Sequence, residues 1–470
     1  MKLILQHLKP HKKLVVLTIL LVAVSSVSDL ILPSLNATII NDGVMKSNFN
    51  VIFLYGGLMV LMSILMGGCS LLSSYCSAKL GASFGRDLRH TIFSKVQTFS
   101  QADVDEFGAA TLITRNTNDV NSLQQTVQMA LRFMLMTPVM LVGSIIMALK
   151  QAPQLSVILL VAVPVVGVVV VLITTKTRPL FSKQQKQVDR LNQVLREQLS
   201  GVRVIRAFVR GKYEENRYQT ANRDMYKIAT HAHRLMTLMM PTLMIVMNAS
   251  ILVAYGFGAR EIDNGVIEIG NLTAFIEYMM SILMSIQMCS MMFNMVPRAM
   301  TNAGRISLIV NKEPSITDRD VKTGKDGKPI PVGKFEALEF RDVSFAYPGT
   351  SRPVVNHVSF TALPGETTAI IGSTGSGKTS LINLLPRFYD VTSGAILLNG
   401  EDIRHYPEDT LRRAMGVVPQ KSFLFEGTVA SNLRFGKEDA TEDELWHALE
   451  VAQGKDFVSE RPGQLESDIT

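Results

Sequence analysis

Six long apolar stretches dominate the N-terminal two thirds of the chain. Each is long enough to cross a bilayer, which takes about 20 mostly apolar residues. Asp29 in the first and Glu277 in the last are their only charged residues. The stretches are Leu14–Leu32, Val51–Leu72, Phe133–Leu149, Leu155–Thr175, Leu235–Ala259 and Leu272–Val296. They predict an all-α transmembrane domain with six spans over residues 1–310. No small-residue cleavage site follows the first span, so a removable signal peptide is not expected.

Positive charge alternates along the segments that join these stretches. Residues 176–234 hold 14 Lys/Arg against 5 Asp/Glu and residues 79–132 hold six Lys/Arg, whereas the loops 41–50 and 260–271 hold one each. Because short loops rich in Lys and Arg stay in the cytoplasm, both termini and the two long connections are predicted to lie inside. The surplus of 47 Lys+Arg over 40 Asp+Glu then reflects membrane topology, and no nucleic-acid partner is expected.

The longer inner connection is predicted to form helices that project beyond the membrane. Phe181–Arg234 is rich in Gln, Arg, Glu and Leu and lacks Pro, a composition that favours helix. Val188, Leu191, Leu195 and Leu199 recur at helical spacing. Another cytoplasmic domain is expected to meet the tips of these helices.

The rest of the chain has the composition of a soluble domain. Residues 311–334, with the Pro-, Gly- and Lys-rich stretch Glu313–Lys334, are predicted to be a flexible linker. Residues 335–470 are predicted to form an α/β domain, in which Phe335–Phe345 alternates apolar and polar residues as a half-buried strand does. All three cysteines of the chain lie in apolar stretches, so neither a disulfide framework nor a thiolate zinc site is expected.

A phosphate-binding loop stands inside this second domain. Thr367–Ile371 is a short β-branched run that predicts a strand, and Ser380–Leu385 predicts a helix. The segment between them matches the pattern G-x-x-x-x-G-K-[ST]. Glycines let backbone N–H groups curl around a phosphate, Lys378 can reach the β- and γ-phosphates, and the Thr379 hydroxyl can bind Mg²⁺. The residues expected to bind nucleotide are Gly372, Ser373, Thr374, Gly375, Ser376, Gly377, Lys378, Thr379 and Ser380.

Six spans, long cytoplasmic helices and this loop on one chain resemble an ATP-binding-cassette (ABC) exporter half-transporter of the multidrug type, over the whole chain. Phe345-Ala-Tyr347-Pro-Gly is similar to the family's aromatic loop, and Val417-Val-Pro-Gln420 is similar to its Q-loop. The resemblance implies that Tyr347 stacks on adenine and that Gln420 approaches Mg²⁺ and the attacking water. Further similar segments are Thr114–Asp119 and Gly201–Phe208, which resemble the two intracellular loops, and Phe425–Asn432, which resembles the part that faces the transmembrane helices.

The same resemblance implies the setting of the protein. It implies ATP and Mg²⁺ as cofactors and ABC-type transport ATPase activity. The expected partners are a second half-transporter, identical or different, the lipid bilayer and a small-molecule cargo. The expected location is the plasma membrane of a prokaryote, with the nucleotide-binding domain in the cytoplasm.

The chain also departs from the family's pattern. The family's domain continues with an LSGGQ-type signature, a Walker B strand with a catalytic Glu, and a switch His, none of which occurs in the 470 residues. His405 and His447 stand too early to be the switch His, and Glu466 follows no apolar strand. We therefore expect a C-terminally truncated half-transporter with no catalytic residue of its own. Three hypotheses stay open: an exporter subunit, a nucleotide-binding subunit that depends on an intact partner for hydrolysis, and a non-functional fragment.

The cargo is approached through two features of the spans. Asp29 and Glu277 are candidate substrate-binding residues, because ionisable groups are costly inside a membrane; the alternative is a structural role. Twelve of the 25 methionines fall in the last two spans, and methionine suits surfaces that accommodate apolar ligands of several shapes. Together they suggest a lipophilic, cationic cargo, against the alternative that methionine only fills gaps between helices. The methionines are Met236, Met239, Met240, Met244, Met247, Met279, Met280, Met284, Met288, Met291, Met292 and Met295.

Overall fold

The structure of the protein is a computed structural model that describes residues 2–323 and 329–469. Within them it describes every side chain except those of Lys2, Ser290, Met291, Phe293, Asn294 and Arg319, so Met291 of the methionine group lies outside the described side chains. The chain divides into two compact units. Unit 1 comprises residues 1–99 and 103–314, and unit 2 comprises residues 100–102 and 315–470.

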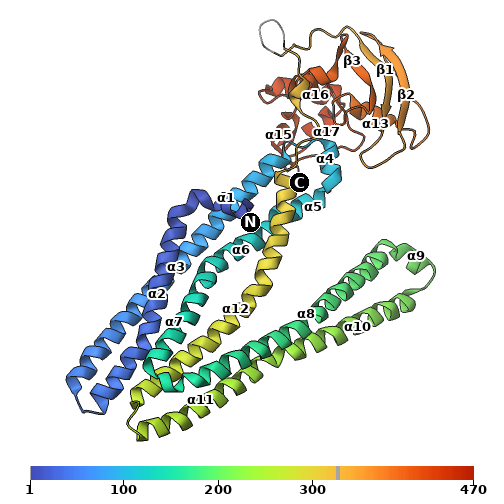
Figure 1. Ribbon diagram of the computed structural model, residues 1–470. Coiled ribbons are helices and arrows are strands. Elements are labelled where there is room, and N and C mark those ends of the chain that lie inside the picture. The colour runs from blue at the N-terminus through green and yellow to red at the C-terminus, as the bar shows by residue number, and fades with distance from the viewer. Residues whose placement is uncertain (1, 324–328, 470) are drawn as a thin grey trace. The chain divides into compact units, whose positions relative to one another are not determined.

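Unit 1 consists of long helices (Figure 1). Six helical runs among the described residues are long and apolar enough to cross a membrane, which confirms the prediction of six apolar helices. The runs are Leu3–Val44, Phe49–Val96, Ala109–Gln151, Pro153–Ser200, Gly211–Asp263 and Ile269–Cys289. The α-helices are α1 (Lys2–Leu8), α2 (Lys12–Thr38), α3 (Phe49–Val96), α4 (Gln101–Phe107), α5 (Ala109–Thr114), α6 (Val120–Met129), α7 (Leu135–Gln151), α8 (Ser156–Ser200), α9 (Val202–Ala207), α10 (Gly211–Thr237), α11 (Met239–Asp263) and α12 (Ile269–Val310). Short π-helical or 3₁₀ turns join several of them; among these are η2 (Ile39–Val44), η3 (Arg115–Asp119) and η4 (Ala130–Met134).

Several helices run far past the apolar stretch that predicted them. α3 has 48 residues and α8 has 45, about twice the length that a bilayer needs. Hydropathy ends where polar residues begin, but a helix continues as long as its backbone hydrogen bonds do. The spans therefore extend into the polar connections without a break.

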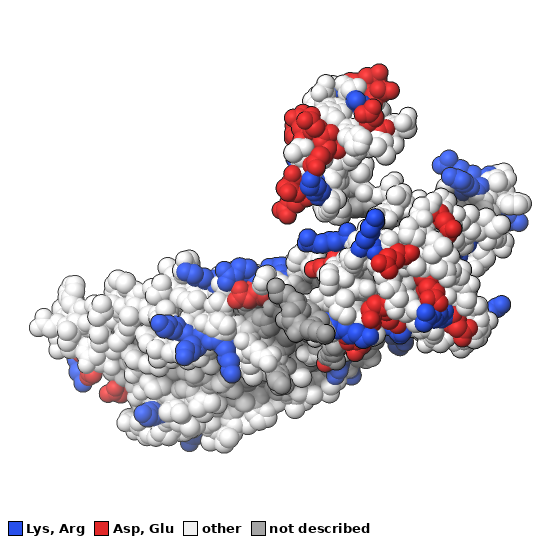
Figure 2. All heavy atoms as spheres, turned by 90° about the horizontal axis from the view of Figure 1, so that it is seen from above, with Lys and Arg blue, Asp and Glu red and all other residues white. Residues whose placement is uncertain are grey.

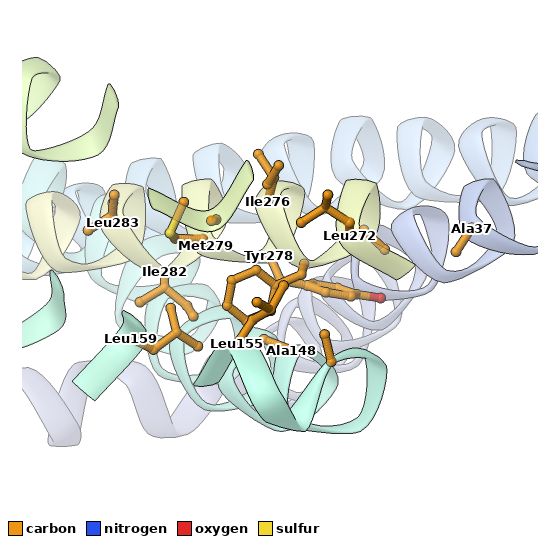
Figure 3. Close-up of a cluster of buried hydrophobic side chains, with 14 of the residues drawn as sticks. Ala37, Ala148, Leu155, Leu159, Leu272, Ile276, Tyr278, Met279, Ile282 and Leu283 are labelled. Carbon is orange, nitrogen blue, oxygen red and sulfur yellow. The ribbon is translucent and has the colours of Figure 1, made fainter. Parts of the chain in front are cut away.

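Two separate clusters of buried side chains hold unit 1 together. The first, here core A, gathers residues of α2, α7, α8, α11 and α12, and its largest member is Tyr278. Figure 3 shows the Tyr278 ring among the aliphatic side chains of core A, and its hydroxyl donates to the carbonyl oxygen of Leu30 at 2.7 Å. The second, core B, gathers residues of α1, α3, α5, α6 and α12, including Phe84 and Ile306. α12 contributes to both cores.

Polar contacts of α2 and the following turn η2 with α12 accompany core A. Asn36 Nδ2 donates to Glu277 Oε1 at 3.1 Å. Asn41 Nδ2 donates to Asn271 Oδ1 at 2.8 Å, and Asn41 Oδ1 accepts from the Gly270 backbone at 2.7 Å. These bonds satisfy polar groups that would otherwise be stranded beside apolar surface.

The α8–α10 hairpin confirms the predicted helical extension. Figure 1 shows α8 and α10 side by side with α9 at the tip. Arg217 pairs with Glu197 at 2.5 Å and Arg190 with Asp224 at 3.8 Å, which fixes the antiparallel register. At the tip, the side chains of Phe208 and Val209 are 73% and 88% exposed.

Unit 2 holds a four-stranded antiparallel sheet in the order β2-β1-β3-β4. Its strands are β1 (Leu338–Phe345), β2 (Val355–Ala362), β3 (Ser393–Leu398) and β4 (Glu401–Asp402), and β5 (Gly427–Thr428) pairs separately with β6 (Asp468–Ile469). The expected strand at Phe335–Phe345 is confirmed as β1, although it begins three residues later than predicted. The helices are α13 (Lys378–Leu384), α14 (Glu408–Arg413), α15 (Val429–Leu433), α16 (Glu442–Val451) and α17 (Lys455–Ser459). Phe340, Val343 and Leu384 lie in the core beneath the sheet.

The prediction of a strand at Thr367–Ile371 is wrong. The segment belongs to no strand of either described sheet, and Ile371 is 90% exposed. β-branched residues fit a pleated surface, but they form a strand only where a neighbour completes the hydrogen-bond ladder. Val418, in the Q-loop-like segment, is also apolar, unpaired by any described strand and 97% exposed.

Much of the surface of unit 1 is apolar. In Figure 2 the charged side chains leave wide white areas over the long helices. The exposed side chains there include Phe53, Leu160 and Leu252. Such faces suit hydrocarbon rather than water, as expected for helices that span a bilayer.

Candidate nucleotide-binding site

The phosphate-binding loop lies between β2 and α13, and its shape depends on two glycines. Gly375 and Gly377 adopt φ values of +85° and +90°, a region that L side chains rarely enter. A Cβ on Gly377 would also come within 2.6 Å of the Val354 carbonyl oxygen. The loop can therefore pass close to the chain that leads into β2 only because this residue is glycine.

Lys378, the first residue of α13, lies across the loop. Its ammonium group donates to the carbonyl oxygens of Gly372 and Ser373, both at 2.8 Å, and lies 3.4 Å from Ser376 Oγ. The positive charge is thus held at the loop by uncharged acceptors, with no carboxylate among them. A phosphate oxygen is a stronger partner for an ammonium group than these are, so the residues present fit the polyphosphate of a nucleotide.

The neighbouring candidates differ in how far they are fixed. Tyr347 OH and Ser380 Oγ are 2.9 Å apart, so the aromatic loop is tied to the first turn of α13. The Tyr347 ring packs edge-on against Phe345 and Tyr389, with ring centroids 4.9 and 5.3 Å away. Sequence reasoning did not find Tyr389, and no spacing rule connects it with the motif.

Two further candidates have no partner within the part of the chain that the structure describes. Thr379 is exposed beside Lys378, and its hydroxyl makes no hydrogen bond to described residues. Gln420 is exposed in an irregular segment and likewise contacts no described polar group. Thr379 is therefore available for Mg²⁺ next to the loop, whereas no contact brings Gln420 to the loop.

A cavity of about 580 Å³ adjoins the loop. Phe360 and Val358 of β2 form one wall, Ile370 of the unpaired segment forms another, and Ser376 and Lys378 form its polar end. Its volume lies in the range of small-molecule sites, roughly 300–1,000 Å³. The loop therefore opens onto a space with one cationic end and apolar walls.

The two intramembrane carboxylates have different surroundings. Glu277 accepts the hydrogen bond from Asn36, which gives it a structural partner. Asp29, half-buried on α2, has no hydrogen bond or ion pair among the described residues. Neither carboxylate contacts the other.

Six membrane-length helices and a phosphate-binding loop on one chain define a membrane protein with a nucleotide-binding unit. Residues 15–286 match the model of the ABC transporter transmembrane region, and residues 355–468 match the ABC transporter model. The chain belongs to the ABC transporter family, and it has the order of domains of an exporter half-transporter.

Relatives of this chain include proteins with named cargo. An uncharacterized ABC transporter ATP-binding protein of Mycobacterium tuberculosis is 40% identical over 96% of this chain and 78% of its own length. An ATP-dependent lipid A-core flippase of Syntrophus aciditrophicus is 29% identical over 86% of this chain and 66% of its own. A fatty acid ABC transporter ATP-binding/permease protein of Mycobacterium bovis is 30% identical over 82% of this chain and 59% of its own.

Proposed function

We propose that this chain is one half of a dimeric ABC exporter that uses ATP to move a lipophilic small molecule across the membrane. The proposal is carried by the presence, on one chain, of six membrane-length helices and a loop that holds the Lys378 ammonium at its mouth. Two relatives are named for lipid A-core and fatty acid transport, which supports a lipophilic cargo.

Each nucleotide-site residue has a stated role in this proposal. Lys378 and the loop from Gly372 to Ser376 bind the phosphates, Thr379 binds Mg²⁺, and Tyr347 lies against adenine. Gln420 would have to approach the loop before it could bind the same ion. When bound with Mg²⁺, ATP would supply, through its hydrolysis to ADP and phosphate, the free energy that drives transport. The protein's own groups bind and orient the nucleotide, and the glycine conformations allow its phosphates to approach the backbone closely.

The α8–α10 hairpin supports a second half-transporter as the partner. An open cavity of about 480 Å³ at the tip is lined by the largely apolar side chains of Val204, Ile205, Phe208 and Tyr213 together with the charged Arg210 and Glu214. Val209 also has φ +53°, unusual for a β-branched residue. An exposed apolar patch of this kind suits docking to another protein, and we propose the nucleotide-binding unit of the second half as that protein. The Lys/Arg-rich connections support a position of the hairpin on the cytoplasmic side of the membrane. We place the whole protein in the plasma membrane of a prokaryote.

The proposal is tested by transport into inside-out membrane vesicles. ATP should drive uptake of a lipophilic dye by vesicles that contain the chain with its partner half, and Lys378→Ala should abolish that uptake because the charge at the phosphates is lost. Lys455→Ala, at an exposed position on α17 that is not among the described residues lining the cavity beside the loop, is the matched control and should keep normal uptake. ATP-dependent uptake that survives in Lys378→Ala would refute the assignment.

A further inference from the structure

A cavity of about 140 Å³ lies within unit 1, between α6 with its π-helical turn η4 and the middle of α12. Five of the nine lining residues that the structure describes are methionines. The described lining consists of Thr126, Met129, Ala130, Phe133 and Met134 on one side and Met288, Met292, Met295 and Val296 on the other. Its one hydroxyl, Thr126 Oγ1, already donates to the Ser122 carbonyl oxygen at 2.8 Å. The described lining is therefore almost wholly apolar.

The cavity falls between the two cores. On one side of it, Met140 of α7 and Ile282 of α12 belong to core A. On the other side, Val127 of α6 and Ala299 of α12 belong to core B. The residues that line the cavity belong to neither cluster, so the space is a gap between cores rather than a defect within one.

Irregular helix geometry coincides with this gap on both sides. η4 replaces an α-helical turn by a π-helical one, and such turns often mark functional sites. Pro297 follows Val296 within α12, and proline cannot donate the hydrogen bond of a regular helix. The helices on both sides of the cavity are thus irregular where they border it, and we attribute the open space to this irregularity.

The chemistry of the walls defines the ligand. An apolar cavity of about 150 Å³ in another protein stays dry and binds benzene, so this cavity matches one aromatic ring in size. Thioether sulfurs make favourable contacts with aromatic rings, and the Phe133 ring can pack against another ring. Methionine is also flexible enough to fit rings of different substitution.

We propose that this methionine cavity binds an uncharged aromatic ring of the transported molecule. This inference rests on the proposed export function, and it adds a site and a ligand class to it. The methionines that matter are then Met129, Met134, Met288, Met292 and Met295. Met236 at the end of α10 and the methionines of α11 (Met239, Met240, Met244 and Met247) are not among the described residues that line the cavity.

Photolabelling of the full chain in nanodiscs with a phenyl(trifluoromethyl)diazirine tests the proposal. Peptide mass spectrometry should locate the label on η4 and on the middle of α12, and an excess of benzene should remove it. Met292→Trp, which fills the space, should abolish the labelling of η4. Met295→Phe fills less of it and serves if the first variant does not fold. Met244→Trp, at an exposed position on α11, is the matched control and should leave the label unchanged.

Two arms distinguish an aromatic-ring site from a lipid-filled cavity and from the nucleotide site. A phospholipid with a photoreactive acyl tail should label the cavity walls no more than it labels exposed Met244; heavier labelling would show that a bilayer chain fills the cavity and would overturn the proposal. Lys378→Ala should keep the aromatic label while losing transport. Unlabelled walls in a chain that still transports with ATP would refute the cavity and leave the proposed function standing.

Discussion

At the scale of single residues, Glu277 can be tested apart from any cargo. Its Oε1 accepts from Asn36, and a glutamine side chain keeps that acceptor. We expect Glu277→Gln to fold like the wild type, whereas Glu277→Leu strands the Asn36 amide and should cost about 0.6–2 kcal/mol, the usual range for hydrogen bonds between membrane helices. Thermal unfolding in detergent measures the difference.

The same pair of variants tests a cargo role for Glu277. If the carboxylate binds a cation on the cargo, Glu277→Gln should lower the transport of cationic dyes and spare neutral ones. If the wild type and Glu277→Gln transport cationic and neutral dyes equally well, Glu277 has a structural role only. Asp29, which has no described partner, would then be the remaining charged candidate.

At the scale of elements, the linker is held to unit 2 by charge. The ammonium of Lys322 donates to Glu401 Oε1 at 2.7 Å, and the backbone N–H of Lys322 donates to the His405 carbonyl oxygen. Lys322 and the adjacent ring of His405 hold the pKa of the Glu401 carboxyl below its ordinary value. The backbone N–H of Ile330 donates to the Lys322 carbonyl oxygen at 3.2 Å, so Ile330 is attached to the same point.

Acid should release this attachment. A carboxyl whose pKa is lowered by folding contributes stability above its unfolded pKa of about 4.3 and loses it as the pH falls through the lower folded value. The unfolding temperature of unit 2, followed by the fluorescence of Trp446, should therefore fall less between neutral and acidic pH in Glu401→Gln than in the wild type. Glu460→Gln, at an exposed position with no ion pair among the described residues, should follow the wild-type curve; identical curves for all three proteins would exclude the attachment.

At the scale of the whole molecule, the main prediction concerns ATP hydrolysis. Lys378 places its ammonium group at the phosphate loop, and losing one preorganised group costs a reaction about 2.7–4 kcal/mol. With the partner half present, we expect Lys378→Ala to release phosphate roughly 100- to 1,000-fold more slowly than the unchanged chain. Equal rates of phosphate release from the two proteins would show that this loop is not the nucleotide site.

The sequence predicted the architecture better than it predicted contacts. Six apolar runs gave the six spans because hydropathy directly reflects the solvent of a helix. The strand at Thr367–Ile371 failed, since pairing depends on a neighbour and not on the segment's own residues. Likewise, the methionine count singled out α11 and α12, but only folding brings Met292 together with Met129 of a different helix.

The position of core A and core B on one helix has a mechanical consequence. α12 is packed into core A towards one end and into core B towards the other. The stretch between the two cores contains Pro297 and faces the methionine cavity. One end of α12 can tilt against the other most easily in this stretch. Tightly packed cores resist deformation, whereas few contacts must be remade between them. A ring bound in the cavity would hold its two walls apart, so the size of the ring would set the angle between the two ends of α12. Bulkier cargo would hold the two halves of the helix at a different angle, so the size of the cargo would be converted into the position of a helix end.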